Sequence, residues 1–380
     1  MTNVAIKPKV LEWAMIRSGD STALKRKFTR LEGWLAGNAS PSLRQLEDFA
    51  RASRVPVGFL FLSEPPEENL PIPDLRTFQG RGVAIPSPDL LDTVYLCQRR
   101  QAWYQEYAEE NGEGPRNFIG SLTVQSAPEK AAAQIESAIG FAVGSRKQCP
   151  TWSDALRLFI QRAEDAGVLV MVSSVVGSNN TRKLDPQEFR GFALADKLAP
   201  LVFINGADTK AAQMFTLAHE LAHLWLGESA VSNAGLAVAA EQSVEVWCNS
   251  VAAELLVPLG ELRKQVAGAA QALSIVDALA REFKVSTLVI LRRLMDAGCI
   301  SRRQFQIKYE AEVERLTNLR RSGGGNFYLT QTARLSRRFA RAVVTSTLEG
   351  QTLYRDAFQM LGIKKERTFR ALGELLEVVG

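Results

Sequence analysis

The sequence predicts an α+β fold that is mostly α. We expect an all-α N-terminal domain, a central domain with a small antiparallel sheet, and an α-helical C-terminal region. Three observations support this prediction. Helical periodicity with capping residues dominates the 380 residues, β-rich runs are confined to residues 168–204, and a proline-rich stretch separates the first 63 residues from the rest.

The first 63 residues have the pattern of several short helices in succession. Amphipathic stretches cover residues 9–17, 22–28, 31–35 and 43–54, with glycine, serine and proline between them. Residues 64–88 begin with Glu64-Pro65-Pro66 and continue through Pro71 and Pro73. Because proline-rich chain stays extended and semi-rigid, we expect residues 64–88 to be a linker between domains.

The central part, residues 89–300, is expected to be one domain, followed by a basic helical region at 301–380. Residues 168–172 form a β-rich run, and residues 189–196 and 201–204 are typical of a β-hairpin around a turn at 197–200. Asp208 or Thr209 can cap a helix that ends at Gly227, and a further helix over 241–257 should stop at Pro258.

Charge is distributed unevenly along the chain. The net charge is +5, yet residues 281–380 carry 19 Lys or Arg against 10 Asp or Glu, and the middle of the chain is acidic. Basic ends favour contacts with nucleic acid or an acidic partner, and a solvated helical surface is the alternative interpretation. The scattered cysteines (Cys97, Cys149, Cys248, Cys299), the lack of a long apolar run and the lack of a signal-peptide pattern predict a cytoplasmic protein without membrane contact.

Only two histidines are present, His219 and His223, and they flank Glu220 in the order His-Glu-Leu-Ala-His. This excludes a site with three histidine ligands. On a helix, residues four apart share a face, so both imidazoles can reach one Zn²⁺ ion while Glu220 acts as a general base. Such a site indicates hydrolysis of an amide, and the hairpin strand over 189–196, if it lies at the sheet edge, would let an extended peptide pair with it.

The third zinc ligand must be a carboxylate or a thiolate, since no histidine remains. The following helix offers Glu241, Glu245, Cys248 and Glu254. We choose Glu245 because Asn249 lies four residues later on the same face, where it can support a ligand or pin the helix. Solvent exposure is the preferred interpretation for Glu241 and Glu254, and a small core residue for Cys248.

These residues resemble the ImmA/IrrE family of zinc metallopeptidases. The resemblance covers about residues 150–300 and includes Phe189-Arg190-Gly191-Phe192, the histidine motif, and Glu245 through Pro258. It implies a zincin-like central domain and a Glu four residues before the Asn, which here is Glu245. Val251 stands where phenylalanine is commoner.

The N-terminal residues 1–63 resemble an Xre-type helix-turn-helix domain. Trp34-Leu35-Ala36-Gly37 followed by Ser40-Pro41-Ser42-Leu43 carries the resemblance, although the recognition segment at 29–35 is short and Leu35 replaces a usual Glu. Double-stranded DNA is therefore the expected partner, and its phosphates would be bound by Lys25, Arg26, Lys27 and Arg30. A helical module for protein contacts is the alternative.

Members of this family resemble antirepressor proteases, which cleave a partner regulator, and some resemble antitoxin components. The expected function is a zinc endopeptidase that cleaves a specific protein, with a DNA-binding head. A non-proteolytic transcription regulator or antitoxin is the alternative, and a general degradative protease is a third possibility. The sequence leaves the oligomeric state open.

Overall fold

The computed structural model describes residues 4–75, 86–232, 243–266, 268–317 and 334–378. These residues are mostly helical and contain one four-stranded sheet, so the predicted α+β, mostly α class is confirmed. The chain divides into two compact units. The first unit comprises Met1–Pro71 and Ile85–Asp92, and the second comprises Ile72–Ala84 and Thr93–Gly380.

The helices of the first unit lie close to where the sequence places them. Asp20 caps one of them by accepting a hydrogen bond from the backbone N–H of Ala23, and Ser42 forms a capping box with Gln45. The ring of Phe49 packs edge-on against that of Trp34 in the core. The elements are α1 (Pro8–Arg17), α2 (Ser21–Lys27), α3 (Leu31–Leu35), α4 (Leu43–Ser53) and the 3₁₀-helix η1 (Val57–Phe61).

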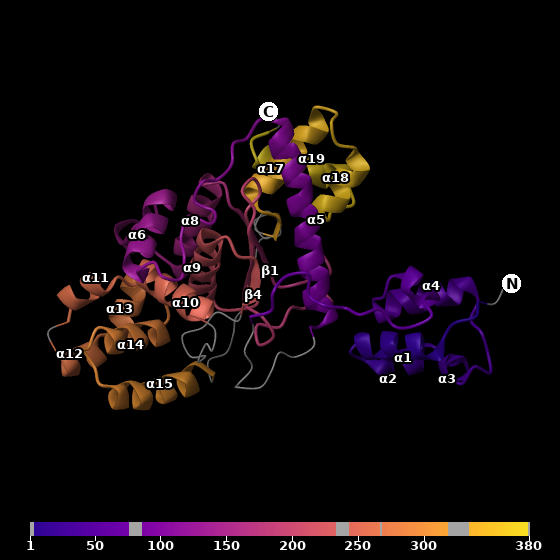
Figure 1. Cartoon of the computed structure of the whole chain (residues 1–380), viewed down its shortest axis with the longest axis horizontal. Coiled ribbons are helices and arrows are strands. Elements are labelled where there is room, and N and C mark those ends of the chain that lie inside the picture. Colours follow the sequence, from indigo (N-terminus) through magenta and orange to yellow (C-terminus); the bar gives the residue numbers. More distant parts are fainter. Residues whose placement is uncertain (1–3, 76–85, 233–242, 267, 318–333, 379–380) are drawn as a thin grey trace. The chain divides into compact units, whose positions relative to one another are not determined.

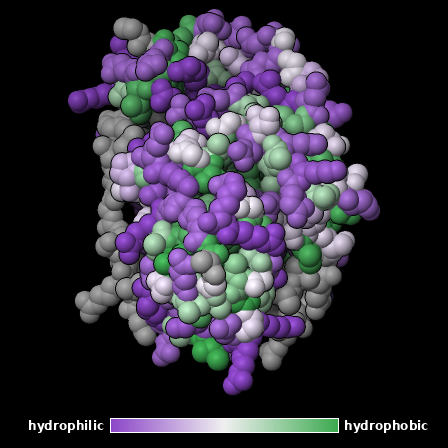
Figure 2. Space-filling model, turned by 90° about the vertical axis from the view of Figure 1, so that its left-hand side faces the viewer, coloured by the Kyte–Doolittle hydropathy of each residue, from purple (hydrophilic) through white to green (hydrophobic). Residues whose placement is uncertain are grey.

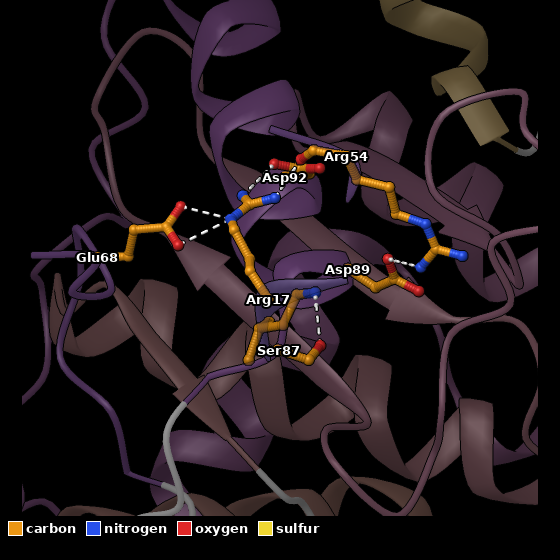
Figure 3. A network of polar contacts seen from close by, with 7 residues as sticks. Arg17, Arg54, Glu68, Ser87, Asp89 and Asp92 are labelled. Atoms are coloured by element: carbon orange, nitrogen blue, oxygen red, sulfur yellow. Dashed lines mark hydrogen bonds and ion pairs between the residues drawn. The ribbon is translucent and has the colours of Figure 1, made fainter. Parts of the chain in front are cut away.

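A buried arginine ties the proline-rich stretch to these helices. Arg17 is 8% exposed, and its Nε lies 2.8 and 2.7 Å from the two carboxylate oxygens of Glu68 (Figure 3). The same guanidinium group donates to the carbonyl of Arg54 and lies 3.4 Å from Asp92. Residues near Glu68 are thus held against the helices of the first unit, because a buried guanidinium group requires partners.

The second unit is built on a mixed sheet with the strand order β1-β3-β2-β4. β2 and β3 form the predicted antiparallel hairpin, but β1 pairs with β3 in parallel, so the expectation of a wholly antiparallel sheet is wrong. β1 precedes the hairpin in the chain, and β3 pairs between β1 and β2. The strands are β1 (Leu169–Ser173), β2 (Gly191–Leu194), β3 (Leu201–Asn205) and β4 (Ala230–Ser232).

Helices cover both faces of the sheet, with α8 and α9 on one face and α5 on the other (Figure 1). From Thr93 onward, α5 belongs to the second unit. The face under α9 contains an extensive apolar core, which also includes residues of α6, α10, α13 and α14. The helices are α5 (Pro88–Glu110), α6 (Pro128–Ile139), α7 (Val143–Lys147), α8 (Trp152–Asp165), α9 (Lys210–Leu226), α10 (Ser243–Leu256), α11 (Leu259–Lys264), α12 (Ala269–Ser274), α13 (Val276–Phe283), α14 (Thr287–Asp296) and α15 (Arg302–Thr317).

The C-terminal helices α17 (Arg337–Leu348), α18 (Tyr354–Leu361) and α19 (Glu366–Leu375) pack near α5 (Figure 1). Arg338 donates to the hydroxyl of Tyr104 at 2.7 Å and to Glu113, and Arg341 donates to a backbone carbonyl within the same helical group. Part of the basic charge in this region therefore serves internal contacts.

Glu164 joins α8 to the start of α17. Its carboxylate accepts hydrogen bonds from the Ser336 hydroxyl and from the backbone N–H of Arg337 at 2.8 Å. Burial raises the pKa of Glu164 to about 7, against hydrogen bonds that lower it. The buried carboxyl group therefore ionises at a higher pH in the folded chain than in the unfolded chain.

We expect the Glu164→Gln variant to lose part of the pH dependence of stability. Since the pKa of Glu164 is raised in the folded state, its stabilising contribution is complete below about pH 4.5 and is lost as the pH rises through about 7, by at most about 3 kcal/mol. The substituted glutamine side chain keeps an acceptor but does not titrate. Urea unfolding followed by circular dichroism at pH 5 and pH 8 measures the free energy of unfolding of Glu164→Gln and of the unsubstituted protein. If this free energy falls by the same amount between pH 5 and pH 8 in both proteins, the prediction is wrong.

Hydrophilic side chains predominate on the side where Figure 1 draws α11–α15, and hydrophobic side chains form smaller groups between them (Figure 2). Among the described residues, no helix combines the length and apolarity that crossing a bilayer requires.

Candidate metal centre

Helix α9 places both histidines and Glu220 in the interior of the second unit. The Thr209 side chain caps the helix by accepting from the Ala212 N–H, and Gly227 ends it in the left-handed conformation at φ 74°, as predicted. His219, Glu220 and His223 are each 0% exposed. Three ionisable side chains buried on one helix require a compensating partner, because isolated buried charge is costly.

Helix α10 supplies Glu245 and Asn249 from one face. Two buried arginines hold its C-terminal end: Arg146 donates to the carbonyls of Leu255 and Leu256, and Arg293 donates to the carbonyl that follows the helix. Burial lowers the pKa of Arg146 to about 10, so the group stays charged at neutral pH and complements the helix C-terminus.

Two other candidate ligands on this helix have different roles. The expectation that Glu254 faces solvent is wrong, because its carboxylate pairs with the buried Arg293 and accepts from the Leu259 N–H. Cys248 is 0% exposed in the apolar core, and burial raises the pKa of its thiol well above the usual value. Glu241 lies outside the described residues.

His219, His223 and Glu245 converge on one point. Their ligand atoms all lie within 4.8 Å of one another. The Nε2 atoms of His219 and His223 are 3.1 Å apart, and Glu245 Oε1 lies 3.0 Å from His223 Nε2. Two imidazoles and a carboxylate in this arrangement suit Zn²⁺, which takes such ligands at about 2.0–2.2 Å. The set therefore fits a metal with three protein ligands.

Asn249 fixes the orientation of one of these ligands. Its Oδ1 lies 3.1 Å from His219 Nδ1, so Nδ1–H donates a hydrogen bond to this amide oxygen. The lone pair of His219 Nε2 then points toward His223 and Glu245. His223 Nδ1 is buried and has no hydrogen-bond partner among the described residues. This contact also joins α9 to α10.

Charges within the cluster oppose the effect of burial. Burial alone would raise the pKa of Glu245, but the neighbouring imidazoles outweigh it and lower the pKa to about 2. Glu245 also raises the pKa of His219 against the desolvation that lowers it. The carboxylate of Glu245 is therefore ionised at neutral pH, which is the form that binds a cation.

Glu220 lies beside the cluster without joining it. The Ser232 hydroxyl of β4 donates to Glu220 Oε1, while Oε2 is buried and has no hydrogen-bond partner in the described part of the chain. Burial raises the pKa of Glu220, although both imidazoles lower it. One carboxylate oxygen is thus oriented and the other remains available for proton transfer.

Gly191 permits the close approach of β2 to this carboxylate. A Cβ atom there would lie 2.6 Å from Thr216 Cγ2 and 3.0 Å from Glu220 Oε1. Sequence reasoning missed Ser232 altogether, because it belongs to a three-residue strand that carries no motif. The condition that residues 189–196 lie at a sheet edge is not met, because β2 lies between β3 and β4.

The predicted DNA-contacting residues lie in the other unit. Lys25, Arg26 and Lys27 of α2 are exposed, as is Arg30 before α3. Lys25 lies 3.6 Å from the carboxylate of Glu32, and α3 is only five residues long. These four basic side chains are therefore exposed and close to one another in the sequence, and the short helix α3 follows them.

We expect Asn249→Ala to weaken zinc binding by about 10- to 100-fold, because removing a hydrogen-bond partner of a ligating histidine has effects of this size. Asn249→Asp keeps an acceptor oxygen for His219 Nδ1 and serves as the matched control. Competition with a chromophoric chelator measures both dissociation constants. Equal affinities of the Ala variant and the unsubstituted protein would argue against this role.

The residues of this centre lie within a match to a known family model. Residues 163–295 match the family model of the IrrE N-terminal-like domain, a peptidase family, and residues 335–375 match a domain of unknown function, DUF8813. The first match contains all the residues of the cluster and supports the resemblance to the ImmA/IrrE family. No family model covers the N-terminal helices. No curated protein and no solved structure gave a significant match.

Proposed function

From the premise that residues 163–295 form an IrrE-like peptidase domain, we propose that the chain is a zinc-dependent endopeptidase that cleaves a specific regulator protein. The observation that supports it most strongly is the buried cluster of His219, His223 and Glu245 with Glu220 beside it. A buried ligand set next to a separate carboxylate is what metal-assisted hydrolysis requires.

The residues of the chain divide the work of hydrolysis. His219, His223 and Glu245 would hold the ion, and Zn²⁺ bound there would act as a Lewis acid on the scissile carbonyl. Glu220 takes a proton from the attacking water and returns it to the leaving amine. Ser232 holds one oxygen of Glu220 in place, so the other oxygen performs the proton transfer.

The proposal of a specific regulator as substrate rests on the resemblance to antirepressor proteases and on the separate N-terminal unit. To test it, zinc-loaded protein is incubated with the purified products of neighbouring genes, and mass spectrometry identifies any cut. A single discrete cleavage that depends on zinc supports the proposal. Degradation of casein and all other proteins would instead support a general protease.

We also propose that the first unit binds double-stranded DNA through Lys25, Arg26, Lys27 and Arg30. Their exposure supports contacts with phosphates, and the short α3 offers little length for reading bases. Alanine at these positions should make the salt dependence of binding shallower by about 0.9 in log–log slope per lost contact. Binding that does not change with salt would favour a protein-contact module.

The alternative is a non-proteolytic transcription regulator or antitoxin in which zinc is structural. The same exposed cations favour it. A Glu220→Gln variant that keeps full regulatory activity in cells would support this alternative, whereas loss of that activity supports proteolysis.

A further inference from the structure

The outer edge of β4 is occupied by a segment of the chain itself. The Val231 N–H donates to the carbonyl of Pro73 at 3.0 Å, and the Leu75 N–H donates to the carbonyl of Val231 at 2.9 Å. Asp74 and Val231 form a parallel bridge. We refer to residues 73–75 as the edge segment. It lies where a further strand would add to the sheet.

This edge lies directly beside the catalytic carboxylate. Ser232, the residue after Val231, donates to Glu220, and its carbonyl accepts from the Arg190 N–H on the β2 side. The main-chain groups of Val231 therefore point away from β2, toward the edge segment. An extended polypeptide that pairs with Val231 would therefore pass close to the carboxylate of Glu220.

Two features make the edge segment a replaceable partner. In the described part of the chain, its backbone hydrogen bonds to β4 are those at Val231, and parallel pairing is less stable per residue than antiparallel pairing. Pro71 and Pro73 favour an extended conformation before pairing, and Pro73 offers a carbonyl but no N–H. The segment is therefore extended before it pairs, so it occupies the edge at little entropic cost.

Resting on the proposed peptidase function, we propose that the outer edge of β4 binds the substrate as an extended polypeptide by strand addition, and that the edge segment is an internal competitor for it. The substrate supplies a carbonyl to the Val231 N–H and an N–H to the Val231 carbonyl, replacing Pro73 and Leu75. Cleavage then requires release of residues 73–75, so the resting chain is restrained by its own edge segment.

The test uses Leu75→Pro, which removes the N–H donated to Val231, with Leu75→Ala as the matched control that keeps this N–H. Both zinc-loaded full-length proteins are given a library of blocked random-sequence dodecapeptides, and new amino termini are counted with a fluorogenic amine reagent. We expect Leu75→Pro to cleave about fivefold faster, the usual net effect of one hydrogen bond, and Leu75→Ala to match the unsubstituted protein. If both variants cleave the peptides and do so at equal rates, the proposal is wrong.

A second measurement does not depend on catalysis. Hydrogen exchange at the Val231 amide should be about fivefold faster in Leu75→Pro than in Leu75→Ala, while the amides of β3 stay unchanged. In a Leu75→Pro/Glu220→Gln protein, the same peptide library should slow exchange at Val231 again. If neither protein cleaves peptides but the library protects Val231, the peptidase function fails and the binding edge stands.

Hydrogen exchange in the unsubstituted protein tests the proposal without a substitution that could impair folding. If the edge segment detaches locally, Val231 exchanges faster than the β3 amides. If Val231 is as slow as β3, or if the library leaves Val231 exchange unchanged in the doubly substituted protein, residues 73–75 are a permanent fifth strand and the proposal is wrong.

Discussion

Replacing Glu220 with glutamine is expected to abolish peptide-bond cleavage while the protein still binds one zinc ion. Glutamine has the same shape and can still accept from Ser232, but it cannot take a proton from water. General-base catalysis is worth about 10²- to 10⁴-fold, so the rate should fall by at least two orders of magnitude. Cleavage assays on the identified partner, with metal content from mass spectrometry, measure both effects.

The control for Glu220→Gln is Glu228→Gln, an exposed carboxylate just beyond the end of the same helix. It removes one negative charge near the site without touching the cluster, and we expect its rate to be unchanged. Glu220→Gln with normal cleavage would mean that another group transfers the proton. Loss of zinc from Glu220→Gln would mean that the carboxylate contributes to metal binding.

Replacing His223 with alanine is expected to eliminate stoichiometric zinc. Removing a partner of a ligand already costs about 10- to 100-fold in affinity, so the loss of a ligand should exceed 100-fold. His223 is close to both His219 and Glu245, and its absence would leave two of the three proposed ligands. Zinc should then no longer raise the melting temperature, because stabilisation by a ligand depends on its concentration relative to the dissociation constant.

Calorimetric scans with and without zinc measure this effect, and Asn249→Ala gives the intermediate case. A His223→Ala protein that keeps a zinc-dependent rise in melting temperature would show that the ion binds elsewhere. Glu254→Gln is a useful contrast, since Glu254 pairs with Arg293 and should affect folding more than zinc affinity.

The histidine helix was predictable because its signals are local. Thr209 and Gly227 mark its ends, and the four-residue spacing puts both histidines on one face. Glu245 required a choice among several residues, but its spacing from Asn249 was again a local helical pattern. The hairpin of β2 and β3 followed from two apolar runs around a turn.

Features that depend on long-range pairing were not predictable in the same way. β4 has only three residues, which is too short for a periodic pattern, so neither its place beside β2 nor the contact of Ser232 with Glu220 was foreseen. The partner of Glu254 lies 39 residues away on another helix. The extended stretch around Glu68 was predicted from its prolines, but not its attachment to Arg17.

The supports of α10 have a consequence for how the protein can be divided. Arg146, which holds the C-terminal carbonyls of α10, precedes the family-matched residues 163–295, as does Ser126, whose carbonyl accepts from Trp247 Nε1 at 2.7 Å. A fragment trimmed to the matched residues would keep Arg293 but would lose these two anchors of the helix that carries Glu245. The smallest autonomous folding unit with an intact metal centre must therefore begin upstream of residue 126.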